Sequence, residues 1–154
     1  MENLLKIGQL KEHPPDVEEI ERLLVAAQRN LRDAQNESIS PETRFDAAYK
    51  AIMQCGLAAL MMHGYRPDTT RPGHHMIVIQ STPFTIGLGS KRMVVLDAMR
   101  RQRNVADYTG DDVDQSTAQN CIAEAKRLID DVLKWRAVNR PKLVPTKAEP
   151  RGGG

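Results

Sequence analysis

Residues 40–64 constrain the fold more than any other part of the sequence. They open with Ser40-Pro41-Glu42, in which a capping serine precedes a proline at the first helical position. Apolar side chains then recur at alternating three- and four-residue spacings, as on one face of a helix: Phe45, Ala48, Ile52, Cys55, Ala59 and Met62. Because the second half of the segment is apolar on nearly every side, we expect this helix to lie at the centre of the fold or at a subunit interface.

Three further segments show the same helical spacing. A capping box, Asp16 with Glu19, starts a helix that runs to about residue 35. Ser90 can cap another of these helices. The last one begins at Asp114 or Ser116, each of which is a suitable cap. The predicted fold class is therefore all-α: an antiparallel up-down bundle of four main helices with a short additional helix.

The additional helix is predicted at Met76-Ile77-Val78-Ile79. Its β-branched content is typical of a strand, but no other segment reads as a partner strand, and a lone strand leaves its backbone groups unpaired. We therefore expect a short buried helix here, after a loop at residues 65–73.

The chain is expected to divide into three parts. Residues 1–15 form a short helix or an arm, because His13-Pro14-Pro15 ends any helix. Residues 16–138 form the helical domain. Residues 139–154 are rich in proline and glycine and are expected to be a disordered tail.

Composition excludes some classes of protein. The 22 Lys and Arg against 20 Asp and Glu give a net charge of +2, too mild to diagnose nucleic-acid binding. The longest strongly apolar stretch, residues 55–62, is far short of the ~20 residues that span a bilayer, so no membrane role is expected. Cys55 and Cys121 lie in apolar patterns without paired spacing, and no signal-peptide pattern opens the sequence. We expect a cytoplasmic protein with buried thiols.

The most informative polar segment lies near the end of the helix that starts at Ser90. Five residues recur at helical spacing and form one stripe, which we call the polar stripe: Arg100, Arg103, Asn104, Asp107 and Tyr108. Additional cations come from Lys91, Arg92 and Arg101, whereas Asp97 is the one acid among them. A positive helix that ends in Asn, Asp and Tyr can hold a phosphodiester. The candidate catalytic residues are Arg103, Asn104, Asp107 and Tyr108, and the candidate phosphate- or RNA-binding residues are Lys91, Arg92, Arg100 and Arg101.

The motifs together resemble those of HEPN domains (higher eukaryotes and prokaryotes nucleotide-binding). The resemblance covers about residues 17–135 and rests on Ser40-Pro41-Glu42-Thr43-Arg44-Phe45, Gly64-Tyr65-Arg66-Pro67, Gly73-His74-His75, and Arg103-Asn104 with Tyr108. HEPN domains are short helical bundles, commonly dimeric, and many are metal-independent ribonucleases with an Arg followed at a short interval by His. The resemblance implies a homodimer that acts on or binds RNA, as an endoribonuclease of a toxin or defence system, with Arg103, Asn104 and Tyr108 at the dimer cleft.

This sequence departs from the motif, because Tyr108 stands where HEPN ribonucleases have His. A phenol with an ordinary pKa near ~10 is a poor general base, and Asp107 is the substitute base to consider. The alternative function is a catalytically silent binding module, for a nucleotide or for a nucleotidyltransferase-type antitoxin partner that modifies Tyr108. A third alternative is a structural helical dimer in which Arg103 and Asp107 form an ordinary surface pair.

No cofactor or metal is expected. His63, His74 and His75 show neither Cys-x-x-Cys nor His-x-x-x-His pairing, and we expect His74 or His75 to cap or pack a helix start. The segment Gly87-Leu88-Gly89-Ser90-Lys91-Arg92 lacks the spacing of a Walker loop and is interpreted as a flexible turn.

Overall fold

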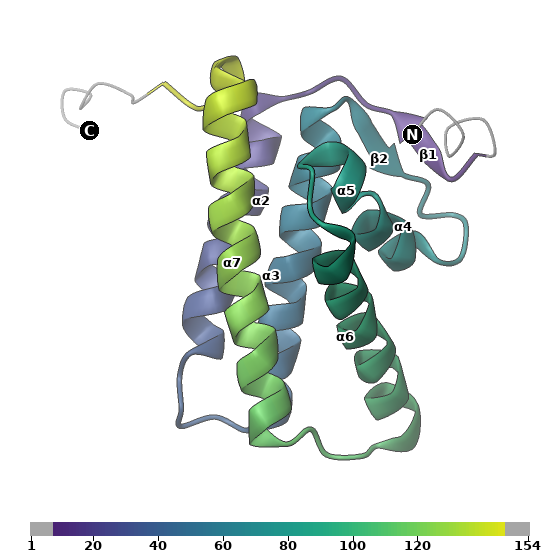
Figure 1. The fold of residues 1–154 in the computed structure, drawn as a ribbon, viewed down its shortest axis with the longest axis vertical. Helices are drawn as coiled ribbons and strands as arrows, with labels where there is room; N and C mark the ends of the chain where they lie inside the picture. The colour runs from purple at the N-terminus through teal and green to yellow at the C-terminus, as the bar shows by residue number, and fades with distance from the viewer. Residues whose placement is uncertain (1–7, 147–154) are drawn as a thin grey trace.

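The computed structural model describes residues 8–146, and most of them are helical. Four long helices run roughly along the long axis of the molecule (Figure 1): α2 (Val17–Ala34), α3 (Pro41–Met62), α6 (Ser90–Thr109) and α7 (Gln115–Asn139). Two short helices, α4 (His74–Gln80) and α5 (Thr82–Thr85), lie between α3 and α6 in the chain. The prediction of a helical protein is confirmed. No helix among residues 8–146 is long and apolar enough to cross a membrane.

Helix α3 is the centre of the fold, as its sequence predicts. It begins at the Ser40 cap, whose hydroxyl accepts a hydrogen bond from the Thr43 amide, and its buried residues come from all sides of the helix. Helices α2 and α7 both pack against it and bury an aliphatic core that includes Ile20, Ile52 and Leu128. This burial of apolar surface on several faces fixes α3 in place.

A two-stranded antiparallel sheet was not predicted. Strand β1 (Leu10–Glu12) pairs with β2 (Tyr65–Pro67), with Leu10 opposite Pro67 and Glu12 opposite Tyr65. Residues 10–12 of the expected N-terminal helix or arm therefore form a strand, and the expected loop at residues 65–73 begins with one. The pairing joins segments far apart in the chain and buries Leu10 in a small apolar cluster, which a local pattern does not reveal. Residues 1–7 lie outside the described residues.

The short buried helix predicted at residues 76–79 is confirmed as α4, in which Ile77, Val78 and Ile79 are buried. Gly56 on α3 faces it. A methyl group at Gly56 would lie 2.6 Å from Val78 Cγ1, so glycine allows α4 to approach α3 this closely.

The helix ends differ from expectation in two places, at the start of α6 and in the tail. Gly89 rather than Ser90 occupies the cap position of α6. At α7 the predicted cap Asp114 is confirmed, since its side chain accepts a hydrogen bond from the Thr117 amide. In the expected disordered tail, Pro141–Leu143 form one turn of 3-10 helix with Leu143 packed against the core. Residues 147–154 of that tail lie outside the described residues.

Candidate functional site

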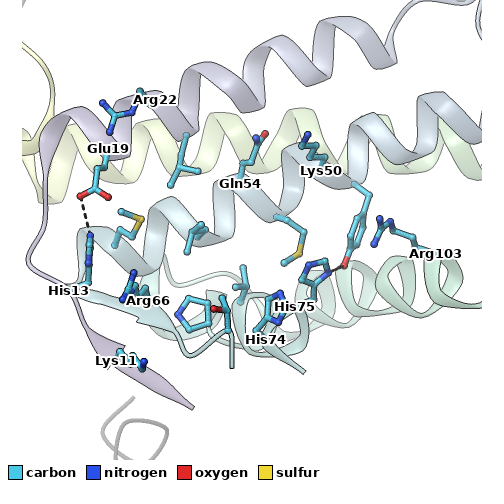
Figure 2. A pocket seen from close by; sticks show the side chains of 18 of the residues that line it. Lys11, His13, Glu19, Arg22, Lys50, Gln54, Arg66, His74, His75 and Arg103 are labelled. Carbon is cyan, nitrogen blue, oxygen red and sulfur yellow. Dashed lines mark hydrogen bonds and ion pairs between the residues drawn. The ribbon is translucent and has the colours of Figure 1, made fainter. Parts of the chain in front are cut away.

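A cleft of about 930 Å³ lies beside α3, and we call it the main cleft (Figure 2). Residues of α2, α3, α4, β1 and β2 line it, and Arg103 of α6 reaches one end. Helix α3 supplies the longest side, through residues that share one face: Asp46, Tyr49, Lys50, Met53, Gln54, Leu57 and Met61.

The lining of the main cleft is strongly cationic around an apolar floor. Among the described residues that line it, the cations are Lys11, Arg22, Lys50, Arg66 and Arg103, the imidazoles are His13, His74 and His75, and the carboxylates are Glu19 and Asp46. The apolar part consists of Leu23, Met53, Leu57, Met61, Pro67 and Val78. A net charge close to zero for the whole chain thus conceals a local excess of positive charge, which attracts an anion with an apolar portion.

One end of the main cleft joins α3, α4 and α6. Tyr49 Oη and His75 Nδ1 lie 3.2 Å apart and share a hydrogen bond. The Arg103 guanidinium lies over the Tyr49 ring at 5.1 Å, within the range of a cation–π contact. Arg103 also pairs with Asp46 on α3, Nε to Oδ1 at 3.8 Å, and not with Asp107 on its own helix. We call Tyr49, His75 and Arg103 the histidine end.

Two side chains of the histidine end, Tyr49 and His75, have shifted pKa values. Burial raises the pKa of Tyr49 to about 12, so its phenol stays protonated at neutral pH. Burial, together with the positive charges of His74, Arg103 and Arg100, lowers the pKa of His75, so this imidazole is neutral at pH 7. When its Nδ1 carries the proton and donates to Tyr49 Oη, Nε2 keeps a free lone pair and can accept a proton.

The opposite end of the main cleft is built by the strand pair and the start of α2, and we call it the strand end. Lys11 on β1 stands opposite Arg66 on β2 in the sheet register. His13 Nε2 and Glu19 Oε1 are 3.1 Å apart, which ties the segment after β1 to α2. In Figure 2 the side chains of Lys11, His13 and Arg66 lie together, away from Arg103. The unpredicted sheet therefore supplies two of the cations that line the cleft.

The structure separates the predicted polar stripe. Arg103 lines the main cleft, but Asn104 is exposed and Tyr108 is 91% exposed. Asp107 lies with Arg103 in the lining of a second hollow of about 200 Å³, whose other lining residues include the carboxylates Glu42, Asp46, Asp111 and Asp112. That acidic hollow repels a phosphate. Residues on one helical stripe still spread over a wide arc, and here Arg103 and Asp107 lie on the side near α3, whereas Asn104 and Tyr108 are exposed.

Most of the predicted phosphate-binding cations have carboxylate partners. Arg92 pairs with Asp131 and, at 3.9 Å, with Glu124, and so connects α6 to α7. Arg100 and Arg101 both pair with Asp97, at 2.9 and 3.2 Å. Lys91 is exposed at the start of α6, and none of the four lines the main cleft.

Sequence reasoning missed Tyr49 and Lys50, and it assigned His74 or His75 to capping or packing a helix start. A signal was present in the positions of the histidines. His13 directly precedes the first proline pair, His74 and His75 open the short helix, and all three line the main cleft. Among residues 8–146 there is no group of three or more His, Cys, Asp or Glu side chains placed to hold a metal ion. Burial raises the pKa of both Cys55 and Cys121 to about 12, so neither thiol is reactive at neutral pH.

Comparison with known proteins finds no family model and no curated protein that matches this chain. The likeness to HEPN domains is therefore a resemblance only, and function is inferred from the geometry of the main cleft.

Proposed function

We propose that the chain binds single-stranded RNA in the main cleft. The observation that carries the proposal is the lining itself: among the described residues, five Lys and Arg side chains and three imidazoles stand against two carboxylates around an apolar floor. Phosphates of a single strand suit the cations, and the faces of unstacked bases suit the apolar floor.

The proposal keeps the HEPN-like up-down bundle and the homodimer that the sequence predicts. Support for the dimer comes from the outer side of α6, where large apolar side chains are exposed at helical spacing: Val94, Val95, Val105 and Tyr108. Two copies of such a stripe bury each other in a two-fold contact. Tyr108 then belongs to the interface and not to the RNA site.

The test is the affinity of purified protein for fluorescein-labelled single-stranded RNA, measured by anisotropy in EDTA. The Lys50→Ala variant removes a cation of the main cleft, and Lys91→Ala, which removes an exposed cation of α6, is the matched control. We expect about ten-fold weaker binding for Lys50→Ala, the size of one lost charge-assisted contact, and no change for the control. Equal effects of both variants would exclude the cleft as the RNA site.

A second candidate function, metal-independent RNA cleavage, is favoured by the histidine end. A ribose 2′-oxygen would attack the adjacent phosphorus and lose its proton to His75 Nε2, while the bond from phosphorus to the 5′-oxygen breaks and that oxygen takes a proton from water. The products are a 2′,3′-cyclic phosphate and a 5′-hydroxyl. Arg103 would stabilise the charge on the phosphate oxygens, and Tyr49 would orient the imidazole.

Cleavage of a mixed RNA pool in EDTA tests this second function. We expect wild type and Tyr108→Phe to produce cyclic ends and His75→Ala and Arg103→Ala to produce none, with all variants shown to be folded by circular dichroism. Activity that survives in His75→Ala would exclude the histidine as the base. Binding without cleavage by wild type would favour the catalytically silent module, with a nucleotidyltransferase as the partner to seek.

A further inference from the structure

Both ends of the main cleft carry cations, and the lining between them is mainly apolar, with Gln54 and His74 among its polar side chains (Figure 2). Figure 2 places Lys11, His13 and Arg66 at the strand end, and Lys50, His75 and Arg103 toward the other end. Apolar side chains of Met53, Leu57 and Val78 line the space between these groups. Cations separated by an apolar stretch suit a ligand with separated anionic groups.

The length of α3 gives the separation. Its lining residues run from Asp46, beside Arg103, to Met61, close to the point where the chain enters β2. Fifteen helical steps at ~1.5 Å per residue place these ends about 22 Å apart. One phosphate cannot contact both ends across that distance.

From this spacing we infer that the main cleft holds an RNA segment of about six nucleotides, with one phosphate-binding subsite at the histidine end and a second at the strand end. At the ~3.4 Å axial rise per nucleotide of a nucleic-acid strand, six nucleotides advance about 20 Å, close to the distance between the two ends. The inference rests on the proposed RNA binding and adds to it a minimum length and a second subsite, built by the strand pair.

Lys11 and Arg66 are well placed for such a subsite. They stand opposite each other in the β1–β2 register, and both side chains line the cleft. Arg66 is exposed, and Lys11 has only a weak ion pair with Asp68, Nζ to Oδ1 at 3.8 Å. Both cations are therefore accessible to a phosphate at little cost in broken contacts.

The experiment measures the affinity of the full chain for oligouridylates of one to ten nucleotides at fixed salt. For wild type we expect affinity to rise at least about ten-fold between three and six nucleotides, as the second contact forms, and to level off beyond about eight. Arg66→Ala and Arg103→Ala should each weaken the hexamer about ten-fold but leave the trimer within two-fold, because a trimer retains the intact end. Lys126→Ala, on the exposed side of α7, is the control.

Three results would overturn the inference, and they are distinguishable. If all lengths bind alike and Arg66→Ala has no effect, the cleft has one subsite and RNA binding itself stands. If Arg66→Ala weakens trimer and hexamer equally, both ends contact the same short ligand. If no oligonucleotide of any length binds wild type, the proposed function fails together with the inference.

Discussion

Replacing Gly56 with alanine should displace α4 from α3 and move His75 of the histidine end away from Tyr49. The added methyl would lie 2.6 Å from Val78 Cγ1 and 3.5 Å from the Val78 carbonyl oxygen. Val78 is 3% exposed and β-branched, so its side chain has neither space nor an alternative rotamer to adopt. The helix must therefore move, and α4 includes both His74 and His75.

The expected change in stability is the difference of two terms. Overpacking a buried contact costs about 1–3 kcal/mol, whereas exchanging glycine for alanine within a helix contributes about 1 kcal/mol of stability. Gly56→Ala should therefore lower the free energy of unfolding by about 0–2 kcal/mol. The double variant Gly56→Ala/Val78→Ala makes room for the methyl. Its free energy of unfolding should therefore be about 1–2 kcal/mol higher than the sum of the two single effects predicts.

Urea denaturation of wild type, both single variants and the double variant gives all four free energies of unfolding. RNA affinity should fall in Gly56→Ala, which displaces His75, and recover in the double variant. If Gly56→Ala stabilises the protein by the full ~1 kcal/mol and shows no coupling with Val78→Ala, the close contact of α3 with α4 is refuted.

Three further predictions follow from other parts of the molecule. Ser40→Ala removes the α3 cap and should lower the free energy of unfolding by about 1 kcal/mol in urea without changing RNA affinity, which makes it a stability control. A bound phosphate should raise the lowered pKa of His75, so RNA binding takes up a proton and RNA affinity should rise as the pH falls from 8 to 5.5. This dependence on pH should be weaker in His75→Gln, and a pH-independent affinity of wild type would contradict the prediction. Val105→Glu should convert a dimer to a monomer in light scattering, and an unchanged mass would exclude the α6 face as the interface.

The helices could be predicted because their signals are local. Ser40 and Asp114 cap the helices that they precede, and the all-round apolarity of residues 55–62 predicts the buried position of α3. Helix α4 could also be predicted, since no other segment reads from its sequence as a partner strand for these β-branched residues. The β1–β2 pair could not, because each strand has three residues and its partner lies more than fifty positions away.

The candidate site could be predicted only at Arg103. Helical periodicity places Arg103 and Tyr108 on one stripe, but it does not say which edge of the stripe faces the neighbouring helix, and the structure turns Arg103 inward and Tyr108 outward. His75 gains its potential role from Tyr49, twenty-six positions earlier in the chain. That proximity depends on how α4 packs against α3, which no local pattern reveals.

The salt dependence of RNA affinity tests most directly whether the cations of the main cleft hold the RNA. For a single strand, the logarithm of the binding constant falls with the logarithm of salt concentration by about 0.7 per phosphate contact. Lys50→Ala/Arg103→Ala should make this slope shallower by about 1.4, while Lys91→Ala/Arg101→Ala, which removes the same charge outside the cleft, should leave it unchanged. Equal slopes for the two double variants would contradict RNA binding in the main cleft.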